Sequence, residues 1–240
     1  MIATQSLADA ASTALRNPEA IVSMILNDAS TGSIAVKLAM LAVFCGSLHG
    51  IALGARGGWR QVLSSVIKAP LIALCSLAIS FPLLYAIGSV AGSGLTLAQT
   101  AGLALLPLAL SAVLVACAVP ALLFFGSTSD YHFTKILHVA VCGAAGVYAM
   151  IVLYGALKSI YNPQSLGAFR VFGLWAAIYA FTGAQMAWVL RPFFGRSGLR
   201  FEWLRRDASE LGFYTAVFLS VREMMGTSPH VAAPAVPRSE

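Results

Sequence analysis

The sequence predicts an all-α fold, a polytopic bundle of about five transmembrane helices, and three observations carry this prediction. Of the 240 residues, 59% are hydrophobic and only 10% are charged, whereas about a quarter of the residues in soluble domains are charged. The mean hydropathy is +0.83. Between Lys68 and Asp130 there is no Asp, Glu, Lys or Arg, and this stretch far exceeds the roughly 20 residues that one helix needs to cross a bilayer.

The predicted bundle lies between two more polar ends. The residues before about Ile21 contain neither a basic leader nor an apolar run, so we expect no cleavable signal peptide. The residues after Gly226 are rich in proline and poor in large apolar side chains, a composition typical of disorder. Four segments are predicted: a polar segment with a short amphipathic helix (1–33), the bundle (34–192), a basic and aromatic tail with an amphipathic helix (193–226) and a disordered end (227–240).

The N-terminal segment is expected to hold one short helix. Residues 1–16 are rich in Ala, Ser and Thr and are expected to be weakly helical at best and mobile. Asn17-Pro18-Glu19 then supplies an N-cap, a proline at the first helical position and an acid in the first turn. The apolar stripe that follows, 21–26, is too short to span. This helix is therefore expected to lie at the membrane surface or to dock on the bundle.

The spans follow from the apolar runs and the residues that interrupt them. Gly88-Ser-Val-Ala-Gly-Ser-Gly94 is the predicted hairpin between the second and third spans. Pro82 in the second span, and Pro107 and Pro120 in the third, each remove a backbone donor and are expected to bend the helix. The predicted spans are 34–55, 66–88, 99–125, 136–157 and 171–190.

Glycine recurs at every fourth position in the first span, at Gly46, Gly50 and Gly54. These positions lie close to one face of a helix, where the missing side chains let a second backbone approach. We call these three residues the glycine face. The pattern predicts a helix-helix contact that organises the bundle.

The tail combines cations with aromatic residues directly after the last span. This pattern is typical of a membrane interface, where aromatic rings anchor and long cations reach the headgroups. Asp207 and Glu210 then stand at capping-box spacing before an apolar face that ends at Gly226. The predicted contacts with lipid or a partner are Arg191, Arg196, Arg200, Trp203, Arg205 and Arg206.

The distribution of Lys and Arg predicts the orientation. With five spans, the Arg56/Arg60 loop, the 126–135 loop and the tail share a side, and that side carries most of the cations. The positive-inside rule then places the C-terminus in the cytoplasm, at a bacterial inner membrane, with the N-terminal segment outside. The net charge of +6 is local to this tail, so the expected partners are the bilayer with its anionic headgroups and a protein partner or a second copy, and no nucleic acid.

Asp130 is the only acidic residue between Asp28 and Glu202, so no carboxylate is predicted at membrane depth. Coupled transporters and pumps normally keep one there, which argues against that class. Asp130 lies in the densest polar cluster, with His132, Lys135 and His138. This cluster is a candidate polar site for a metal, a phosphate headgroup or acid-base chemistry. The alternative is that Ser127 to Asp130 caps the fourth span.

A few further residues are candidates for polar roles within the spans. His49, inside the first span, is expected to bond to a neighbouring helix, with a ligand or pH-sensing role as the alternative. Gln185 is expected to act similarly between helices. The four cysteines, at 45, 75, 117 and 142, are expected to be small buried packing residues. No protease, nucleotide-binding or dinucleotide motif and no paired carboxylates are found, so no catalytic residue, metal or cofactor is predicted.

Two segments carry a resemblance to a known family. Thr128-Ser-Asp-Tyr-His-Phe-Thr-Lys-Ile-Leu-His138 and Trp188-Val-Leu-Arg-Pro-Phe-Phe-Gly195 resemble those of uncharacterised bacterial membrane proteins related to the Yip superfamily. Five predicted spans, two of them broken by proline, resemble the same superfamily, over roughly residues 34–225. The resemblance implies a membrane-organising adaptor with no catalytic residues to transfer. The predicted orientation differs from the eukaryotic members, whose N-termini face the cytosol.

Together these observations predict a bacterial inner-membrane adaptor, scaffold or assembly component that is not an enzyme. A channel or permease for a small solute is the alternative, with a pathway between the second and third spans near His49 and Asp130. A lipid-modifying enzyme is a third hypothesis, which requires Asp130, His132 and His138 to converge on one cavity.

Overall fold

In the computed structural model, every regular element of the described residues is helical. The structure describes residues 6–27, 31–129, 131–161, 167–190 and 203, without the side chains of residues 131, 132 and 135. The elements are α1 (Leu7–Arg16), α2 (Pro18–Leu26), α3 (Thr31–Gly54), the 3-10 helix η2 (Ala55–Gly57), α4 (Trp59–Val90), α5 (Leu97–Thr128), α6 (Tyr131–Ile160) and α7 (Gly167–Val189).

Four of the described helices are long and apolar enough to cross a membrane: Thr31–Gly57, Trp59–Val90, Leu97–Thr128 and Ile136–Ile160. They contain the first four predicted spans. The helix α7 covers most of the fifth predicted span but is not among the four. Its tryptophans, tyrosine and Gln185 lower its hydropathy, so its crossing of the bilayer stays a prediction.

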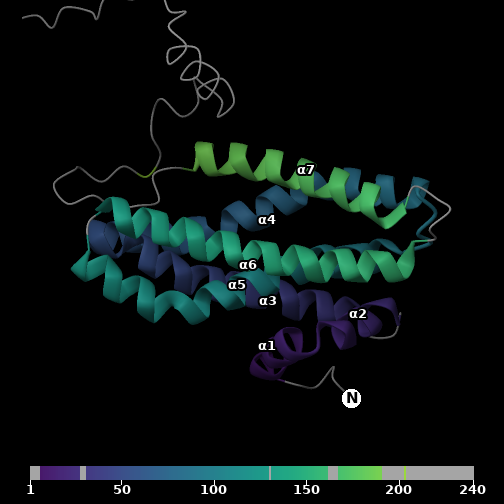
Figure 1. Cartoon of the computed structure of the whole chain (residues 1–240), viewed down its shortest axis with the longest axis horizontal. Coiled ribbons are helices and arrows are strands. Elements are labelled where there is room, and N and C mark those ends of the chain that lie inside the picture. The colour runs from purple at the N-terminus through teal and green to yellow at the C-terminus, as the bar shows by residue number, and fades with distance from the viewer. Residues whose placement is uncertain (1–5, 28–30, 130, 162–166, 191–202, 204–240) are drawn as a thin grey trace, which may run out of the picture.

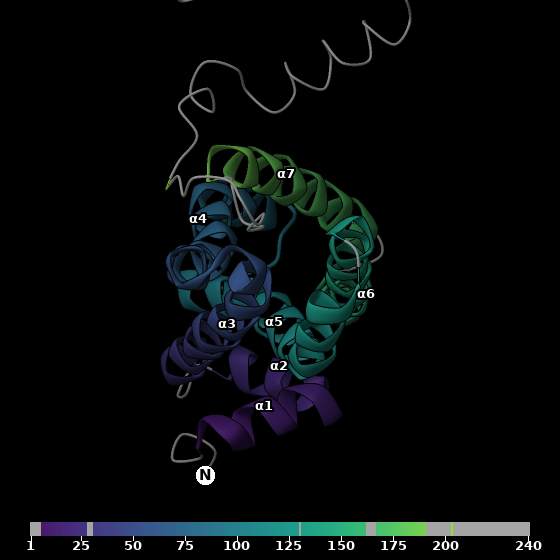
Figure 2. The same cartoon turned by 90° about the vertical axis from the view of Figure 1, so that its left-hand side faces the viewer.

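The five long helices form a ring. Seen from the end in Figure 2, α3, α4, α7, α6 and α5 follow one another around it, and each packs on its neighbours. The helices α1 and α2 lie outside the ring, on the side of α3 and α5 that is opposite α7 (Figure 1). This arrangement gives the long helices an outer side and an inner side.

The outer side of the ring is apolar and the buried side is more polar. Phe44, Ile67, Ile79 and Ile151 are among many large apolar side chains that are exposed, as expected of helices solvated by lipid. On α4, by contrast, several polar residues lie on the buried side. They are Gln61, Ser64, Ser65, Lys68, Ser76 and Ser80.

The helices are longer than the sequence predicts, and the loops are shorter. Pro70 and Pro82 lie inside α4, and Pro107 and Pro120 lie inside α5, without ending either helix. The predicted loop over 126–135 is wrong, because α5 continues to Thr128 and α6 begins at Tyr131. Ser127 and Thr128 donate to the Phe124 carbonyl and so belong to the last turn of α5 rather than to a cap of α6.

The N-terminal segment contains two helices instead of one. The prediction of a weakly helical, mobile stretch over 1–16 is wrong for α1, which Ser6 and Asp9 start with a capping box. The predicted N-cap of α2 is confirmed, since Asn17 Oδ1 accepts from the Ala20 backbone N–H at 3.1 Å. Ile25 of α2 is fully buried in a core cluster with Leu38 and Leu106. The helix α2 is therefore docked on the bundle.

The glycine face lies against α4. A Cβ atom added at Gly50 would lie 2.6 Å from the Cα atom of Val66, and one added at Gly54 would lie 2.5 Å from that of Val62. At Gly46 the nearest atom is the Cβ of Pro70, at 3.3 Å. Backbone atoms cannot yield as a flexible side chain can, so α3 and α4 approach this closely only because residues 50 and 54 are glycine.

Several predictions fall outside the described residues. These are the basic tail positions other than Trp203, the amphipathic helix predicted after residue 207, and the disordered end. Trp203 itself is partly exposed. The prediction that all cysteines are buried is wrong for Cys117, which is exposed on α5, whereas Cys45 is buried.

Replacing glycine with alanine is expected to change the stability in opposite directions at two positions, one in the glycine face and one outside it. Gly143 on α6 has nothing within 4 Å of an added Cβ. Alanine is intrinsically better than glycine in a helix by about 1 kcal/mol, so Gly143→Ala should raise the thermal unfolding midpoint in detergent. Gly50→Ala should lower it, because overpacking costs about 1–3 kcal/mol. Equal shifts at the two positions would contradict a close contact at Gly50.

Candidate functional site

Two histidines from distant parts of the chain meet inside the bundle. His49 Nε2 of α3 lies 3.1 Å from His138 Nδ1 of α6, with the ring centroids 5.3 Å apart. His138 is buried, with 2% of its surface exposed. The Sγ atom of Cys142, one turn after His138, lies 3.9 Å from the same nitrogen of His49. We call these three residues the histidine cluster.

The chemistry of the histidine cluster follows from its burial. An ion buried at membrane depth is costly, so the two imidazoles are expected to be neutral. One ring N–H then occupies the bond between them, and which ring donates depends on the tautomer. If His138 Nδ1 donates, the second nitrogen of His49 carries a proton. In the other tautomer it is an acceptor, so the pair can present either character.

Arg56 ties the end of α3 to the turn between α5 and α6. Its Nη1 donates to the Ser129 carbonyl at 2.8 Å and to the Thr134 hydroxyl at 3.0 Å. Thr134 is buried one turn before His138. Arg56 therefore joins the elements that carry the two histidines, and it fixes their relative position from the end of the bundle.

A cavity of about 240 Å³ lies beside the histidine cluster. We call it the central cavity. Its polar lining comes from His49, Ser111 and Cys142, and the Ser111 hydroxyl donates to the Leu108 carbonyl at 3.0 Å. The rest of the lining is apolar and mostly small. It consists of Ala42, Gly46, Ala69, Pro70, Ala73, Leu108, Ala112, Val115 and Gly146.

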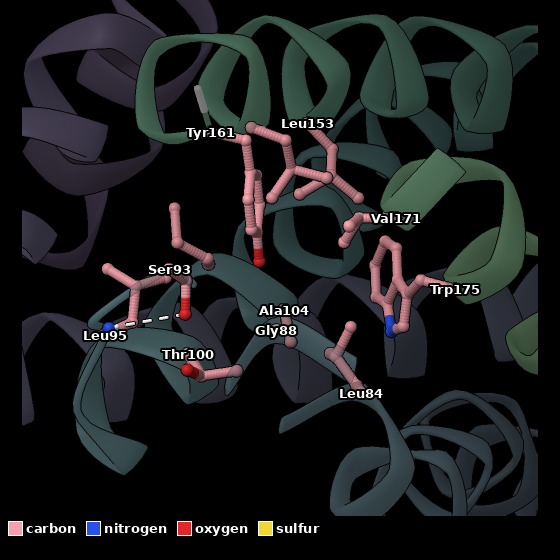
Figure 3. Close-up of a pocket in the computed structure, with 12 residues that line it drawn as sticks. Leu84, Gly88, Ser93, Leu95, Thr100, Ala104, Leu153, Tyr161, Val171 and Trp175 are labelled. Carbon is pink, nitrogen blue, oxygen red and sulfur yellow. Dashed lines mark hydrogen bonds between the residues drawn. The ribbon is translucent and has the colours of Figure 1, made fainter. Parts of the chain in front are cut away.

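A second, smaller cavity of about 30 Å³ lies near the other end of the ring, where α4, α5, α6 and α7 meet. We call it the end cavity. Figure 3 shows Tyr161, Ser93, Thr100 and Trp175 around it. Burial raises the pKa of Tyr161, and a hydrogen bond with the Ser93 side chain opposes this in part. Trp175 Nε1 is buried and has no hydrogen-bond partner in the part of the chain that the structure describes. The volume suffices for a water molecule.

Lys68 on α4 is buried and holds a residue of the C-terminal tail. Its exposed fraction is 1%. Its Nζ donates to the Trp203 carbonyl and lies 5.3 Å from the centroid of the Trp203 ring. A cation over an aromatic face is stabilised electrostatically, more so when it is desolvated. The tail therefore contacts α4 within the bundle at this point.

The predicted polar site is brought together only in part. His49 and His138, which the sequence treats as separate candidates, are in contact. Asp130 lies outside the described residues, and His132 and Lys135 are described only as backbone positions of α6. A lipid-modifying enzyme would need Asp130, His132 and His138 to converge on one cavity, and the side chains of the first two lie outside the described part of the structure. Among the described residues, no group of three or more His, Cys, Asp or Glu could hold a metal ion.

Comparison with known proteins finds no family model, no curated protein and no solved structure that matches this chain. The resemblance to the Yip superfamily stays a prediction.

Two residues of these sites are missed by sequence reasoning. Cys142 is expected only to pack, and Lys68 is noted only as the last charged residue before the long uncharged stretch. The spacing of His138 and Cys142, one helical turn apart, places them on one face and was an available signal. Lys68 offers no comparable signal, because its partner is 135 residues away.

Replacing Arg56 with Gln should destabilise the bundle, because hydrogen bonds of a charged group contribute about 1.5–3 kcal/mol. Arg60→Gln is the matched control, since Arg60 is exposed and lies over the Trp59 ring. Thermal unfolding in detergent should show a clear drop for Arg56→Gln and little change for Arg60→Gln. The same drop in both variants would mean that general charge, not this contact, stabilises the turn.

A double-mutant cycle tests the contact of the two histidines. His49→Phe, His138→Phe and the double variant should give non-additive losses of stability. Membrane-protein hydrogen bonds average about 0.6 kcal/mol, up to about 1.7, and the coupling energy should lie in that range. Reversible unfolding in mixed micelles measures it. A coupling energy of zero would mean that the two rings do not interact.

Proposed function

We propose that this chain is an integral membrane adaptor or scaffold, an assembly component of the bacterial inner membrane. The single observation that carries the proposal is the interior of the ring. In the part of the membrane helices that the structure describes there is no carboxylate. Such a bundle lacks the carboxylate that proton-coupled and sodium-coupled carriers normally keep at membrane depth. Its specific chemistry would then lie at its ends and surfaces.

The separation of the two cavities supports the same proposal. They share no lining residue. Leu108 of the central cavity, and Ala104 and Leu153 of the end cavity, belong to one buried apolar cluster. A permeation path would need polar groups or water along this region, and apolar packing opposes that.

The proposed topology has five spans, with α7 as the fifth. At 23 residues and about 1.5 Å per residue, α7 is about 35 Å long, which is enough for the roughly 30 Å hydrocarbon core. The end of α3, the turn between α5 and α6 and the tail then share one side. The contact of Arg56 with Ser129 is consistent with this arrangement. The cations on that side favour the cytoplasm.

The tail is proposed as the contact with lipid or with a protein partner. Its arginines, at 191, 196, 200, 205 and 206, alternate with aromatic residues, which suits anionic headgroups. The contact of Trp203 with Lys68 would hold this surface against the bundle at residue 203. The adaptor would thus present a basic surface that is held at one position relative to α4.

A channel or permease for a small solute is the second candidate. The central cavity favours it, because His49 and Ser111 place polar groups inside the ring. A transport function requires the central cavity to connect to both sides of the membrane during transport.

Crosslinking and purification of the full-length protein from native membranes separate the two candidates. The adaptor should copurify with a partner in fixed stoichiometry, and liposomes containing it should show no solute flux above empty liposomes. Flux without a stoichiometric partner would support the permease and overturn the adaptor.

Charge reversal locates the contact surface. Arg200, Arg205 and Arg206 changed together to Glu should reduce retention of the partner, or binding to anionic vesicles, by about tenfold or more, since each cation near the surface contributes about 1 kcal/mol. Lys158→Glu with Arg170→Glu is the control at the opposite predicted side. Unchanged binding in the triple variant would reject the tail as the contact.

A further inference from the structure

The central cavity lies at the depth of the hydrocarbon core. Its lining residues fall near the midpoints of the four candidate spans, at 42–49 in Thr31–Gly57, 69–73 in Trp59–Val90, 108–115 in Leu97–Thr128 and 142–146 in Ile136–Ile160. A molecule that reaches this cavity from the bilayer must therefore be soluble in the hydrocarbon core itself.

The helices that line the central cavity are four of the five in the ring. Its lining comes from α3, α4, α5 and α6, and no residue of α7 contributes. In the ring, α4 and α6 are joined through α7, which crosses from one to the other in Figure 2. The cavity is partly open. An occupant would therefore be held by α3, α4, α5 and α6.

The lining decides the charge of the occupant. Among the residues that the structure describes, no Lys, Arg, Asp or Glu lines the central cavity, so a charged group would enter this lining without a counter-charge, at a high cost. His49, Ser111 and Cys142 supply the polar atoms. When His138 Nδ1 donates to His49 Nε2, the second ring nitrogen of His49 carries a proton. His49 can then donate a hydrogen bond to an oxygen acceptor on the occupant.

The size of the central cavity suits a substituted ring. An engineered apolar cavity of about 150 Å³ accommodates benzene, and the central cavity has about 240 Å³. We infer that it binds an uncharged carbonyl compound dissolved in the membrane, of the isoprenoid quinone class, with a carbonyl oxygen at His49 and its chain leaving through the open part of the cavity. This binding site is independent of the adaptor function proposed above.

Two glycines of α6 provide a matched test. Gly146 lines the central cavity and Gly143 is exposed outside it, and an added Cβ meets nothing within 4 Å at either position. Leucine at 146 therefore fills the cavity, whereas leucine at 143 points elsewhere. Both variants keep the glycine face on α3 intact, so both should insert and fold.

The experiment uses the full-length protein in liposomes and a photoreactive azido-quinone with a short alkyl chain. Wild type should be labelled saturably, on peptides of α3 or α6, and an excess of unlabelled quinone should prevent it. Gly146→Leu should reduce labelling at least tenfold, and Gly143→Leu should leave it unchanged. Ala112→Leu, from the α5 side of the same lining, repeats the block and is used if Gly146→Leu fails to fold.

A second arm tests the carbonyl group. An alkyl azide of equal chain length without the quinone ring should label wild type several-fold less. His49→Phe should remove this preference, while quinone labelling falls to the level of the alkyl probe. Equal labelling of wild type and the folded Gly146→Leu and Ala112→Leu variants, or equal labelling by the two probes, would overturn the inference. Either failure leaves the partner purification as an independent test of the adaptor function.

Discussion

The close approach of α3 and α4 is the constraint on which the rest of the structure depends. Within a bilayer, apolar side chains gain little from leaving lipid for another helix, so association relies on packing and on hydrogen bonds between helices. Gly50 and Gly54 let two backbones meet, and the Ser47 hydroxyl donates to the Val66 carbonyl at 3.1 Å across the same contact. The ring continues from this pair on both sides, because α5 packs on α3 and α7 packs on α4.

The ring combines tight and loose contacts. The helix α3 packs extensively on α4 and α5, and α5 packs extensively on α6, whereas α7 contacts α4 and reaches α6 through rings such as Tyr154 and Phe172 near its start. Glycines on α6 and α7, among them Gly143, Gly155 and Gly173, have open space where a Cβ would stand. These three glycines are exposed, so the open space at them lies on the outer side of the ring, and the tight contacts run through α3 and α5.

Local signals in the sequence predict much of the helical fold. The apolar runs identify the membrane helices, and Asn17-Pro18-Glu19 identifies the start of α2, because caps act over three or four residues. The capping box of Ser6 and Asp9 was equally local, but α1 is stabilised further by burying Ala10 and Ala14 against the bundle. Proline inside α4 and α5 does not end these helices. At Pro70, the freed carbonyl of Val66 accepts from the Ser47 hydroxyl of α3.

The candidate sites depend on packing and so could not be predicted in the same way. His49 and His138 are 89 positions apart, and their contact follows from the order of helices around the ring. The contact of Lys68 with Trp203 has a mechanical consequence. A load applied to the tail by whatever it holds would reach a desolvated cation next to Ala69 and Pro70, which line the central cavity. A force on the tail outside the membrane would in this way act on residues near the middle of the membrane.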